Sequence, residues 1–432
     1  MIHDRPAAIA TPTSTGAGDF NIRTLWALTM LGILFGFSMV DRLLLSLNLE
    51  PIKHELHATD TQMSLATGMA FFMFNAIASV PFARFADRNA RMPIIALGFA
   101  FYSLVTACMG MVGSFTQLFV ARALQGAGEA SGQAPASALV NDLVSPRNRR
   151  KALAGLRVFG AVVVMGMTTL LGYINEFYGW RAACFVLAIP AAFIVPLLMF
   201  VREPVRDTKA GAPVEPRVSL RDAWRQWRRS PAFLLVLVGF AFSLVTLQAN
   251  GAWAAAFLAR VREMPPSEIG ALAGLARGPG LLAGSLLGGW LTDRLSRRDH
   301  RWRFWVPGIM LLLGTPCEFV YLTADPYWVF APAYVLTGAL IMGSNVCVIA
   351  ICMDVSGEGL RATGLAVALL LSNLLADLIG PTSIGLMNDT IFASYGVLAL
   401  RYSMAIVACL AALGGISILW AARFETEATR SG

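Results

Sequence analysis

Four charged side chains interrupt long apolar stretches of this sequence. Asp41 and Arg42 stand side by side in one stretch, and Arg122 and Glu129 lie in another. A charge near the centre of a lipid bilayer costs at least about 2.5–3.5 kcal/mol on insertion scales, so it is retained where it is paired, faces a cavity or has a function. A carboxyl group there can take up and release a proton, and a guanidinium group can hold an anion through two parallel hydrogen bonds.

Helical geometry predicts how these four side chains pair. Arg122 and Glu129 are seven positions apart and share one helix face, about two turns from each other, with Gln125 between them. Asp41 and Arg42 are consecutive and point about 100° apart around their helix, so each needs a partner elsewhere. Counting about 1.5 Å per residue from the membrane faces puts Asp41 between the levels of Arg122 and Glu129. We expect Asp41 to pair with Arg122, and Arg42 to approach Glu129 or a substrate.

Such a network can work as a proton switch. Burial favours the neutral form of a carboxylic acid, whereas a nearby guanidinium group favours the charged form. A movement that changes the contact between Glu129 and its arginine can therefore load or unload a proton, and the freed guanidinium group can take an anionic head group. The alternative is a static set of ion pairs that only stabilises the surrounding helices.

Further polar side chains lie within apolar stretches of both halves. Arg277 and Asp377 lie at comparable expected depth and could form a second pair, although no motif marks them. Helix-packing hydrogen bonds are the alternative role for side chains of this kind. The other candidates for lining a central cavity are Gln125, Arg157, Asn250, Asn345 and Asn373.

The elements that carry these residues follow from composition and from the length of the apolar runs. Of the 432 residues, 56% are hydrophobic and only 14% are charged, which is typical of a protein with many membrane spans. A spanning helix needs about 20 largely apolar residues, and twelve such runs predict an all-α integral membrane fold with two pseudo-symmetric six-helix bundles. The predicted spans cover residues 25–49, 61–82, 92–113, 115–141, 151–175, 181–201, 231–257, 268–291, 303–323, 326–353, 361–386 and 397–421.

The spans divide the chain into five segments. Residues 1–24 form an expected disordered cytoplasmic tail, since they lack an apolar core like that of a signal peptide. The first bundle covers 25–201 and the second 231–421, and 422–432 form a cytoplasmic C-terminal tail. The linker 202–230 contains "SLRDAWRQWRRS", which predicts a short amphipathic helix at the cytoplasmic lipid surface, with an ordinary solvated linker as the alternative.

The distribution of Lys and Arg predicts the orientation, because basic residues near span ends prefer the cytoplasmic side. Most of them fall in the even-numbered turns and in the termini. Both termini are therefore expected in the cytoplasm, and the net charge of +8 reflects topology, with no nucleic-acid partner. The opposite face holds only Lys53, Arg181, Arg260, Arg262 and Arg401.

The sequence lacks the residue patterns that several other functions require. None of the four histidines falls inside a predicted span and the six cysteines are scattered through apolar runs, so no metal-ligand cluster is evident. The stretch "RALQGAGEASG" does not fit a dinucleotide-binding loop, because Gly132 comes one position late, and no P-loop supports an ATP-driven pump. We expect no enzyme activity, no metal and no cofactor, with protons as the coupling ion.

Two turns on the predicted cytoplasmic side repeat one pattern. "ARFADRNAR" follows the second span and "GWLTDRLSR" the eighth, and Asp87 aligns with Asp293 in a shared D-R-x-x-R core. Internal repeats are typical of secondary transporters that hold their substrate between two related bundles. An acid and several arginines in a tight turn can form an ion-pair latch, with a solvated turn that serves topology alone as the alternative. The predicted cytoplasmic gate consists of Asp87, Arg88, Arg91, Asp293, Arg294 and Arg297.

The turn pattern resembles a family motif. G-x-x-x-D-R-x-x-R/K is similar to the loop motif of the major facilitator superfamily, and the second turn matches it at Gly289, Asp293, Arg294 and Arg297. The resemblance covers nearly the whole chain. It implies a twelve-helix transporter that works by rocking two bundles about a central site.

A narrower resemblance rests on Asp41 and Arg42 and on "RALQGAGEASGQAPASALVNDL" in the fourth span. Its R-x-x-x-G-x-G-E-A pattern, followed by Pro135, is similar to the spinster branch of that superfamily. This resemblance implies proton-dependent transport of lysophospholipids or sphingolipid-type amphiphiles. We expect a bacterial homologue in an inner membrane, surrounded by bilayer lipid and working as a monomer without an obligatory protein partner.

Two other functions stay open. Related branches that carry organic anions also place charged residues in these helices, so a proton-coupled carrier or exporter of a small organic anion or drug is the main alternative. A receptor on the same scaffold that transports nothing would have no need of a titratable pair. A lipid carrier should have a long cavity with an apolar half, whereas a small-anion carrier should have a closed, polar one.

Overall fold

The computed structural model describes residues 21–88, 90–132, 135–136, 139–140, 143–145, 147–200, 220–357 and 359–428. Throughout this part the regular structure is helical, without a strand. Most of the predicted N-terminal tail and residues 429–432 of the C-terminal tail lie outside the described residues.

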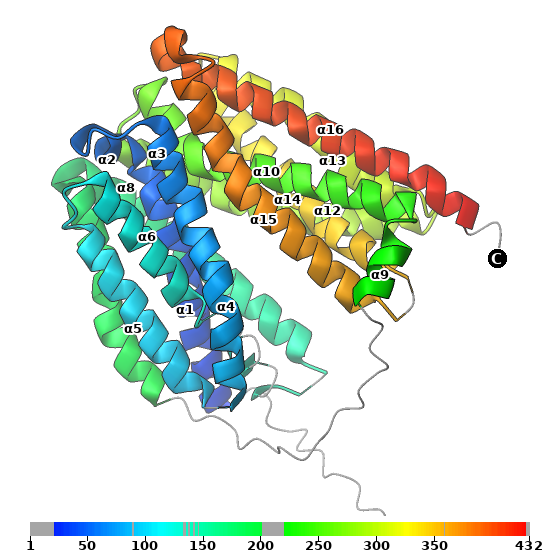
Figure 1. Ribbon diagram of the computed structural model, residues 1–432, viewed down its shortest axis with the longest axis horizontal. Helices are drawn as coiled ribbons and strands as arrows, with labels where there is room; N and C mark the ends of the chain where they lie inside the picture. The colour runs from blue at the N-terminus through cyan, green and yellow to red at the C-terminus, as the bar shows by residue number, and fades with distance from the viewer. Residues whose placement is uncertain are drawn as a thin grey trace, which may run out of the picture.

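The N-terminal bundle begins with α1, and the short helix α2 follows α1 on the surface of the bundle (Figure 1). The second span is continuous through a widened π-helical turn, η1, and α8 changes direction inside its length. The elements are α1 (Ile22–Leu47), α2 (Leu49–Glu55), α3 (Asp60–Leu65), η1 (Ala66–Ala70), α4 (Phe71–Arg88), α5 (Arg91–Met109), α6 (Phe115–Glu129) and α8 (Arg149–Met199).

The C-terminal bundle repeats this plan after the short helix α9 (Leu220–Trp227). Its second span also runs through a π-helical turn, η2. The elements are α10 (Pro231–Arg260), α11 (Pro266–Ala271), η2 (Leu272–Arg277), α12 (Gly278–Ser296), α13 (Trp302–Thr323), α14 (Tyr327–Val355), α15 (Arg361–Asp389), the 3₁₀ turn η3 (Ala393–Leu398) and α16 (Ala399–Ala428).

Ten candidate membrane spans are recognised among the described helices by their length and apolar composition. The long helix α8 contains the fifth and sixth predicted spans, because Gly179 has φ 81° and ψ 167° and interrupts the helix between them. Glycine occupies this backbone region without the strain that a Cβ would bring. Helix α6 covers the fourth predicted span as far as Glu129. The prediction of an all-α, twelve-span fold is confirmed.

The internal repeat extends beyond the D-R-x-x-R turns. The register that aligns Asp87 with Asp293 also aligns Gly68 in η1 with Gly274 in η2. Single π-helical turns of this kind are rare and often occur at functional sites. Each glycine lies against a helix of the other bundle: a Cβ on Gly68 would lie 2.6 Å from the carbonyl oxygen of Asp377. The pseudo-symmetry therefore includes the contacts between the bundles.

The two bundles meet at one end and splay apart at the other (Figure 1). We call the first the closed end, defined by residues 50–61, 260 and 388–389, and the second the splayed end, defined by residues 84–91 and 294–303. At the end of α1 that leads to the closed end, the Ser46 hydroxyl donates to the carbonyl oxygens of Gly251 and Ala252 of α10, at 2.6 Å each.

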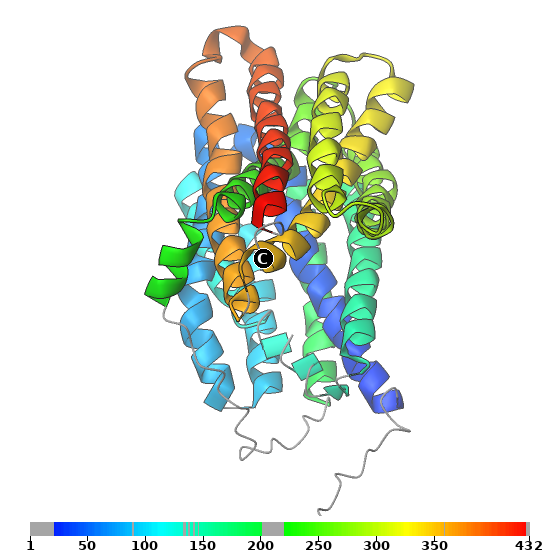
Figure 2. The ribbon, with the colours of Figure 1, turned by 90° about the vertical axis from the view of Figure 1, so that its right-hand side faces the viewer.

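Helix α9 packs on the C-terminal bundle at the splayed end, beside α15 (Figure 2). Trp227 is buried, stacks on Phe233 with ring centroids 5.1 Å apart, and donates from its indole nitrogen to the carbonyl oxygen of Ser356 at 3.1 Å. A short helix thus lies within the predicted linker. Trp227 packs on the protein, while Trp224 of the same helix remains exposed.

Candidate functional site

Arg42 and Glu129 form an ion pair between α1 and the end of α6. Arg42 donates from Nη2 to Oε1 of Glu129 at 2.5 Å and from Nε to Oε2 at 3.2 Å. The Glu129 side chain is 2% exposed, whereas that of Arg42 is 25% exposed. One member of this pair is therefore buried in the N-terminal bundle, and the other reaches an accessible surface.

Asp41 and Arg122 form a second pair deeper in the same bundle. The Arg122 Nη1 and Asp41 Oδ2 atoms are 3.6 Å apart, and each side chain is 1% exposed. Thr106 donates its hydroxyl to Asp41 Oδ1 at 2.7 Å, and Gln125 donates its amide to the same oxygen at 3.3 Å. Arg122 in turn donates to Gln125 Oε1 at 2.9 Å. These partners enclose the pair completely.

The two pairs share an aromatic side chain. Phe71, the first residue of α4, has its ring centroid 4.7 Å from the Arg122 guanidinium carbon and 5.2 Å from that of Arg42. Phe72 lies 5.3 Å from Arg42. Cations are attracted to the face of such rings and gain more when water is excluded. The widened turn η1 directly before Phe71 also matters, because Arg122 donates from Nε to the carbonyl oxygen of Ala66 at 3.3 Å.

Asp41, Arg42, Arg122 and Glu129 are therefore paired as helical geometry predicted. The sequence did not reveal the further residues that contact them. Thr106, Phe71 and Phe72 contribute to this network, and nothing in the sequence sets them apart from ordinary residues of apolar helices. Gln125 was expected to line a cavity, whereas it is fully buried as a bridge between Asp41 and Arg122.

Asp377 faces this network from the C-terminal bundle. Its carboxylate accepts a short hydrogen bond from the side-chain amide of Gln248, which lies on α10. It is also close enough to Arg42 and Glu129 to interact electrostatically with both. Charged groups of both bundles therefore approach each other at the middle of the molecule.

The expected pair of Arg277 and Asp377 is not present. Arg277 instead stacks on the Tyr334 ring of α14, with its guanidinium carbon 4.1 Å from the centroid. Equal depth in the membrane led to this wrong prediction, since depth does not specify the direction in which a side chain points. Arg277 faces the interior of its own bundle, and Asp377 faces the other bundle.

The remaining cavity candidates divide into buried and exposed residues. Asn250 donates to Glu318 Oε1 at 2.7 Å, and Asn345 accepts from the Ser243 hydroxyl at 2.8 Å, both inside the C-terminal bundle. These two are helix-packing residues in this conformation. Arg157 is exposed on α8, and Asn373 is exposed and donates to the carbonyl oxygen of Leu369 on its own helix at 2.7 Å.

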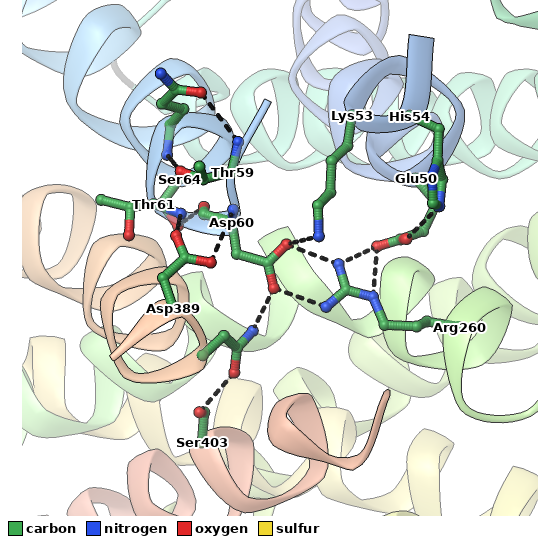
Figure 3. Close-up of polar contacts among 12 residues, drawn as sticks. Glu50, Lys53, His54, Thr59, Asp60, Thr61, Ser64, Arg260, Asp389 and Ser403 are labelled. Carbon is green, nitrogen blue, oxygen red and sulfur yellow. Dashed lines mark hydrogen bonds and ion pairs between the residues drawn. The ribbon is translucent and has the colours of Figure 1, made fainter. Parts of the chain in front are cut away.

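A charged cluster that the sequence reading missed joins the bundles at the closed end (Figure 3). Arg260, the last residue of α10, donates from Nη1 to Asp60 Oδ2 at 2.6 Å and from Nη2 to Asp60 Oδ1 at 2.8 Å. It also contacts Glu50 Oε1, from Nη2 at 2.5 Å and from Nε at 3.0 Å. The Lys53 ammonium group lies 2.5 Å from Asp60 Oδ1. One guanidinium group thus connects two acids of the opposite bundle.

The end of α15 adds hydrogen bonds to the same cluster (Figure 3). Asp389 accepts from the backbone N–H of Thr61 at 2.7 Å and from that of Asp60 at 3.3 Å. Asn388 donates to Asp60 Oδ2 at 2.8 Å and accepts from the Ser403 hydroxyl at 2.6 Å. The start of α3 is therefore held by two elements of the C-terminal bundle.

The predicted gate lies at the splayed end. Asp293 is exposed and forms no ion pair with any residue that the structure describes. Arg294 is exposed and lies 5.5 Å from the Trp290 ring centroid, and Arg297 is also exposed. Arg91 is half-buried, and the side chains of Asp87 and Arg88 lie outside the described residues. The second copy of the motif is therefore not latched in this conformation.

Among the described residues, no group of three or more His, Cys, Asp or Glu side chains could hold a metal ion. The polar chemistry of the centre thus consists of carboxyl, guanidinium, amide and hydroxyl groups. Such groups can exchange protons and hold anions.

Comparison with known proteins gives matches over most of the chain. The family model of the Major Facilitator Superfamily matches residues 30–381. An MFS-type efflux pump of Mycolicibacterium smegmatis is 28% identical over 405 residues, which cover 93% of each chain. Protein spinster homolog 1 of Rattus norvegicus is 28% identical over 371 residues, covering 79% of this chain and 70% of the relative.

A solved structure has the same fold. A bacterial homolog to the human lysosomal transporter Spinster, in an inward-facing and unoccupied conformation, superposes with a TM-score of 0.82 at 22% sequence identity. The match covers 94% of this chain and 98% of that chain. Both resemblances drawn from the sequence agree with these matches.

Proposed function

The chain belongs to the Major Facilitator Superfamily, and we propose that it is a proton-coupled secondary transporter of an amphipathic, lipid-like substrate. It is an integral membrane transporter with many spans. The coupling ion, the substrate class and the sidedness described below belong to this proposal.

The observation that carries the proposal is the unequal burial of the Arg42–Glu129 pair. Arg42 presents a partly exposed guanidinium group beside a carboxylate that is almost fully buried. The Asp41–Arg122 pair is enclosed on all sides and holds α1 against α6. Arg42 can therefore exchange Glu129 for another anion. The Asp41–Arg122 pair keeps the first pair in position.

Coupling follows from competition for one guanidinium group. When Glu129 is ionised, it holds Arg42 through two hydrogen bonds. When Glu129 takes up a proton, it loses its charge, and Arg42 can bind an anionic head group with the same two donors. Release of the substrate lets the carboxyl group lose its proton and recover the arginine. Proton and substrate occupancy are thereby linked at one site.

Rocking of the two bundles would carry this site between the two membrane faces. Asp377 and Gln248 border the site from the C-terminal bundle, so a substrate between the bundles would contact both of them. We assign the splayed end, with its basic turns, to the cytoplasm. On this assignment the conformation is inward-facing, both termini are cytoplasmic and the membrane is a bacterial inner membrane.

Two features favour an amphipathic substrate. The guanidinium group of Arg42 lies beside the rings of Phe71 and Phe72, so a charged head group and an apolar chain could bind side by side. The spinster homologues among the relatives point in the same direction. We expect lysophospholipids or sphingolipid-type molecules, carried by a monomer without an obligatory protein partner.

A second candidate is export of a small organic anion or drug. The match to the efflux pump of Mycolicibacterium smegmatis covers more of both chains than the match to the rat spinster homologue. The charge competition at Arg42 would work equally for a compact anion. The two candidates differ in whether an acyl chain is required for transport.

The test is uptake into proteoliposomes under an imposed pH gradient. A lysolipid panel and a panel of small organic anions would be compared for wild type, Glu129→Gln and, as a matched control, Glu268→Gln, whose side chain is exposed on α11. We expect gradient-driven lysolipid transport in wild type and in Glu268→Gln, and its loss in Glu129→Gln. Gradient-driven transport of Glu129→Gln at the wild-type rate would contradict the proton site, and transport restricted to small anions would favour the second candidate.

A further inference from the structure

A second buried carboxyl group lies in the C-terminal bundle, outside the site described above. Glu318 of α13 is 1% exposed. Its Oε1 atom accepts from the Asn250 amide of α10 at 2.7 Å, whereas its Oε2 atom is buried without a hydrogen-bond partner among the described residues. An ionised carboxylate with one bare oxygen is costly in an environment of low dielectric constant.

The groups around Glu318 do not neutralise it by pairing. Arg277, on η2, is the cation that faces it, but its guanidinium group is stacked on Tyr334 of α14 and forms no ion pair with Glu318. The titratable groups nearest to it on its own helix are Cys317 and Tyr321, and Arg303 at the start of this helix pairs with Asp354. The carboxyl group is therefore enclosed by aromatic, thiol and amide groups, with one cation nearby that is directed elsewhere.

Several buried polar atoms close to Glu318 have no hydrogen-bond partner among the described residues. Besides Glu318 Oε2, the Asn250 Oδ1 and Thr337 Oγ1 atoms are buried without hydrogen-bond partners. Thr337 faces the carboxyl group from α14. An ionised carboxylate can only accept hydrogen bonds, whereas a protonated one carries an O–H donor. One proton on Oε2 removes the buried charge and gives the carboxyl group a donor of its own, whereas the Thr337 hydroxyl beside it can either donate or accept.

We propose that Glu318 is a proton-binding site of the C-terminal bundle and that it is occupied in the conformation described here. The site rests on the proposed proton-coupled transport for its role. Glu129 binds a proton in competition with Arg42 in one bundle, and Glu318 binds a second one in the other bundle. Ionisation of Glu318 becomes favourable when Arg277 leaves Tyr334 and pairs with the carboxylate, so the proton leaves when the bundle changes its internal packing.

Infrared difference spectroscopy of the purified protein tests this site without any transport measurement. A protonated carboxyl group has a C=O stretching band that a carboxylate lacks. We expect this band at neutral pH in wild type, in Glu129→Gln and in the control Glu268→Gln, and its loss in Glu318→Gln. Glutamine resembles the neutral acid in shape, so the variant should keep the wild-type melting temperature. A band of wild-type intensity in Glu318→Gln would overturn the proposal.

A second variant keeps the test valid if Glu318→Gln folds poorly. Arg277→Gln removes the cation that favours ionisation of Glu318, so the band should persist to a pH higher by about 1–3 units. An unchanged titration of the band in Arg277→Gln would also overturn the proposal. Absence of any proton-driven uptake by the wild-type protein would contradict the proposed transport function instead, and it would leave the infrared result standing on its own.

Discussion

Arg260 and Asp60 belong to different bundles and form a two-pronged ion pair, with N···O distances of 2.6 Å and 2.8 Å. The Asp60 side chain is 3% exposed and that of Arg260 is 13% exposed. Because Arg260 also holds Glu50, its guanidinium group connects α10 with both α2 and α3. This contact closes one end of the transporter and can exist only while the bundles meet there.

Replacing Arg260 with Gln should therefore open the closed end. Removal of one partner of a buried ion pair costs about 3–5 kcal/mol, and the partial exposure of Arg260 places the expected effect near the lower limit. A change of that size shifts a two-state equilibrium by about 100-fold. We expect faster hydrogen–deuterium exchange in residues 49–65 and 385–392, measured by mass spectrometry on the purified protein.

Arg262→Gln is the matched control for this variant. Arg262 lies two residues away and pairs with Asp325 of its own bundle at 3.2 Å. Its loss should leave exchange in residues 49–65 at the wild-type rate. Equal exchange in wild type and Arg260→Gln would show that the other contacts of this end, such as those of Asp389 and Asn388 with α3, are sufficient to keep it closed.

Asp41→Asn should destabilise the protein more than Glu129→Gln. The first variant leaves Arg122 buried and charged without a counter-ion, which costs about 3–5 kcal/mol. The second leaves Arg42 unpaired, but this side chain is partly exposed and can be hydrated. Thermal unfolding followed by intrinsic fluorescence should give the lowest melting temperature for Asp41→Asn, with partial recovery in Asp41→Asn/Arg122→Gln. Equal losses for Asp41→Asn and Glu129→Gln would contradict the different roles of the two pairs.

The pairing of the four central charges could be predicted because it depends on helical periodicity and on depth in the membrane. Both can be counted along the sequence. Helical periodicity places Arg122 and Glu129 on one face, and the length of the apolar run gives the depth of Asp41. The same reasoning failed for Arg277 and Asp377, because helix rotation within a bundle is set by tertiary packing. In the structure Arg277 stacks on Tyr334 inside its own bundle.

The closed-end cluster could not be recognised from the sequence for a different reason. Asp60 and Arg260 stand at the ends of helices, where charged residues are common and need no special explanation. Only the meeting of the bundles shows that they contact each other. Glu318 lies toward the outer end of its predicted span, so its position in the sequence does not show whether it is buried. Its neighbours on α10 and α14 in the structure show that it is.

Glu55 gives a pH-dependent contribution at the closed end, outside the spans. Arg181 donates to Glu55 Oε1 at 2.6 Å and Trp180 donates to Oε2 at 2.6 Å, and these hydrogen bonds lower the pKa of the Glu55 carboxyl group. A lowered pKa in the folded state stabilises the protein above the unfolded-state pKa, and this contribution is lost as the pH falls through the folded-state pKa. The difference in melting temperature between wild type and Glu55→Gln should therefore be largest near neutral pH and shrink in acid. A difference that grows on acidification would contradict this assignment.

Gly172 and Gly270 allow α8 and α11 to touch at the closed end, as Gly385 does for α15 and α3. A Cβ on Gly172 would lie 2.5 Å from the carbonyl oxygen of Pro266 and 2.8 Å from the Cα atom of Gly270. Backbone atoms cannot move aside as a flexible side chain can. Alanine at position 172 is therefore incompatible with the closed end as it stands.

The expected result for Gly172→Ala is a folded protein whose closed end stays open. Alanine favours a helix over glycine by about 1 kcal/mol, so α8 itself should not be weakened, and the cost falls on the conformation in which the bundles meet. Gly166→Ala is the matched control, because a Cβ at position 166 of the same helix meets no atom within 4 Å. Hydrogen–deuterium exchange in residues 266–272 should increase in Gly172→Ala and stay at the wild-type rate in Gly166→Ala. If both variants exchange like wild type, close backbone contact is not what keeps this end closed, and the polar contacts of Arg260, Asn388 and Asp389 must be sufficient without it.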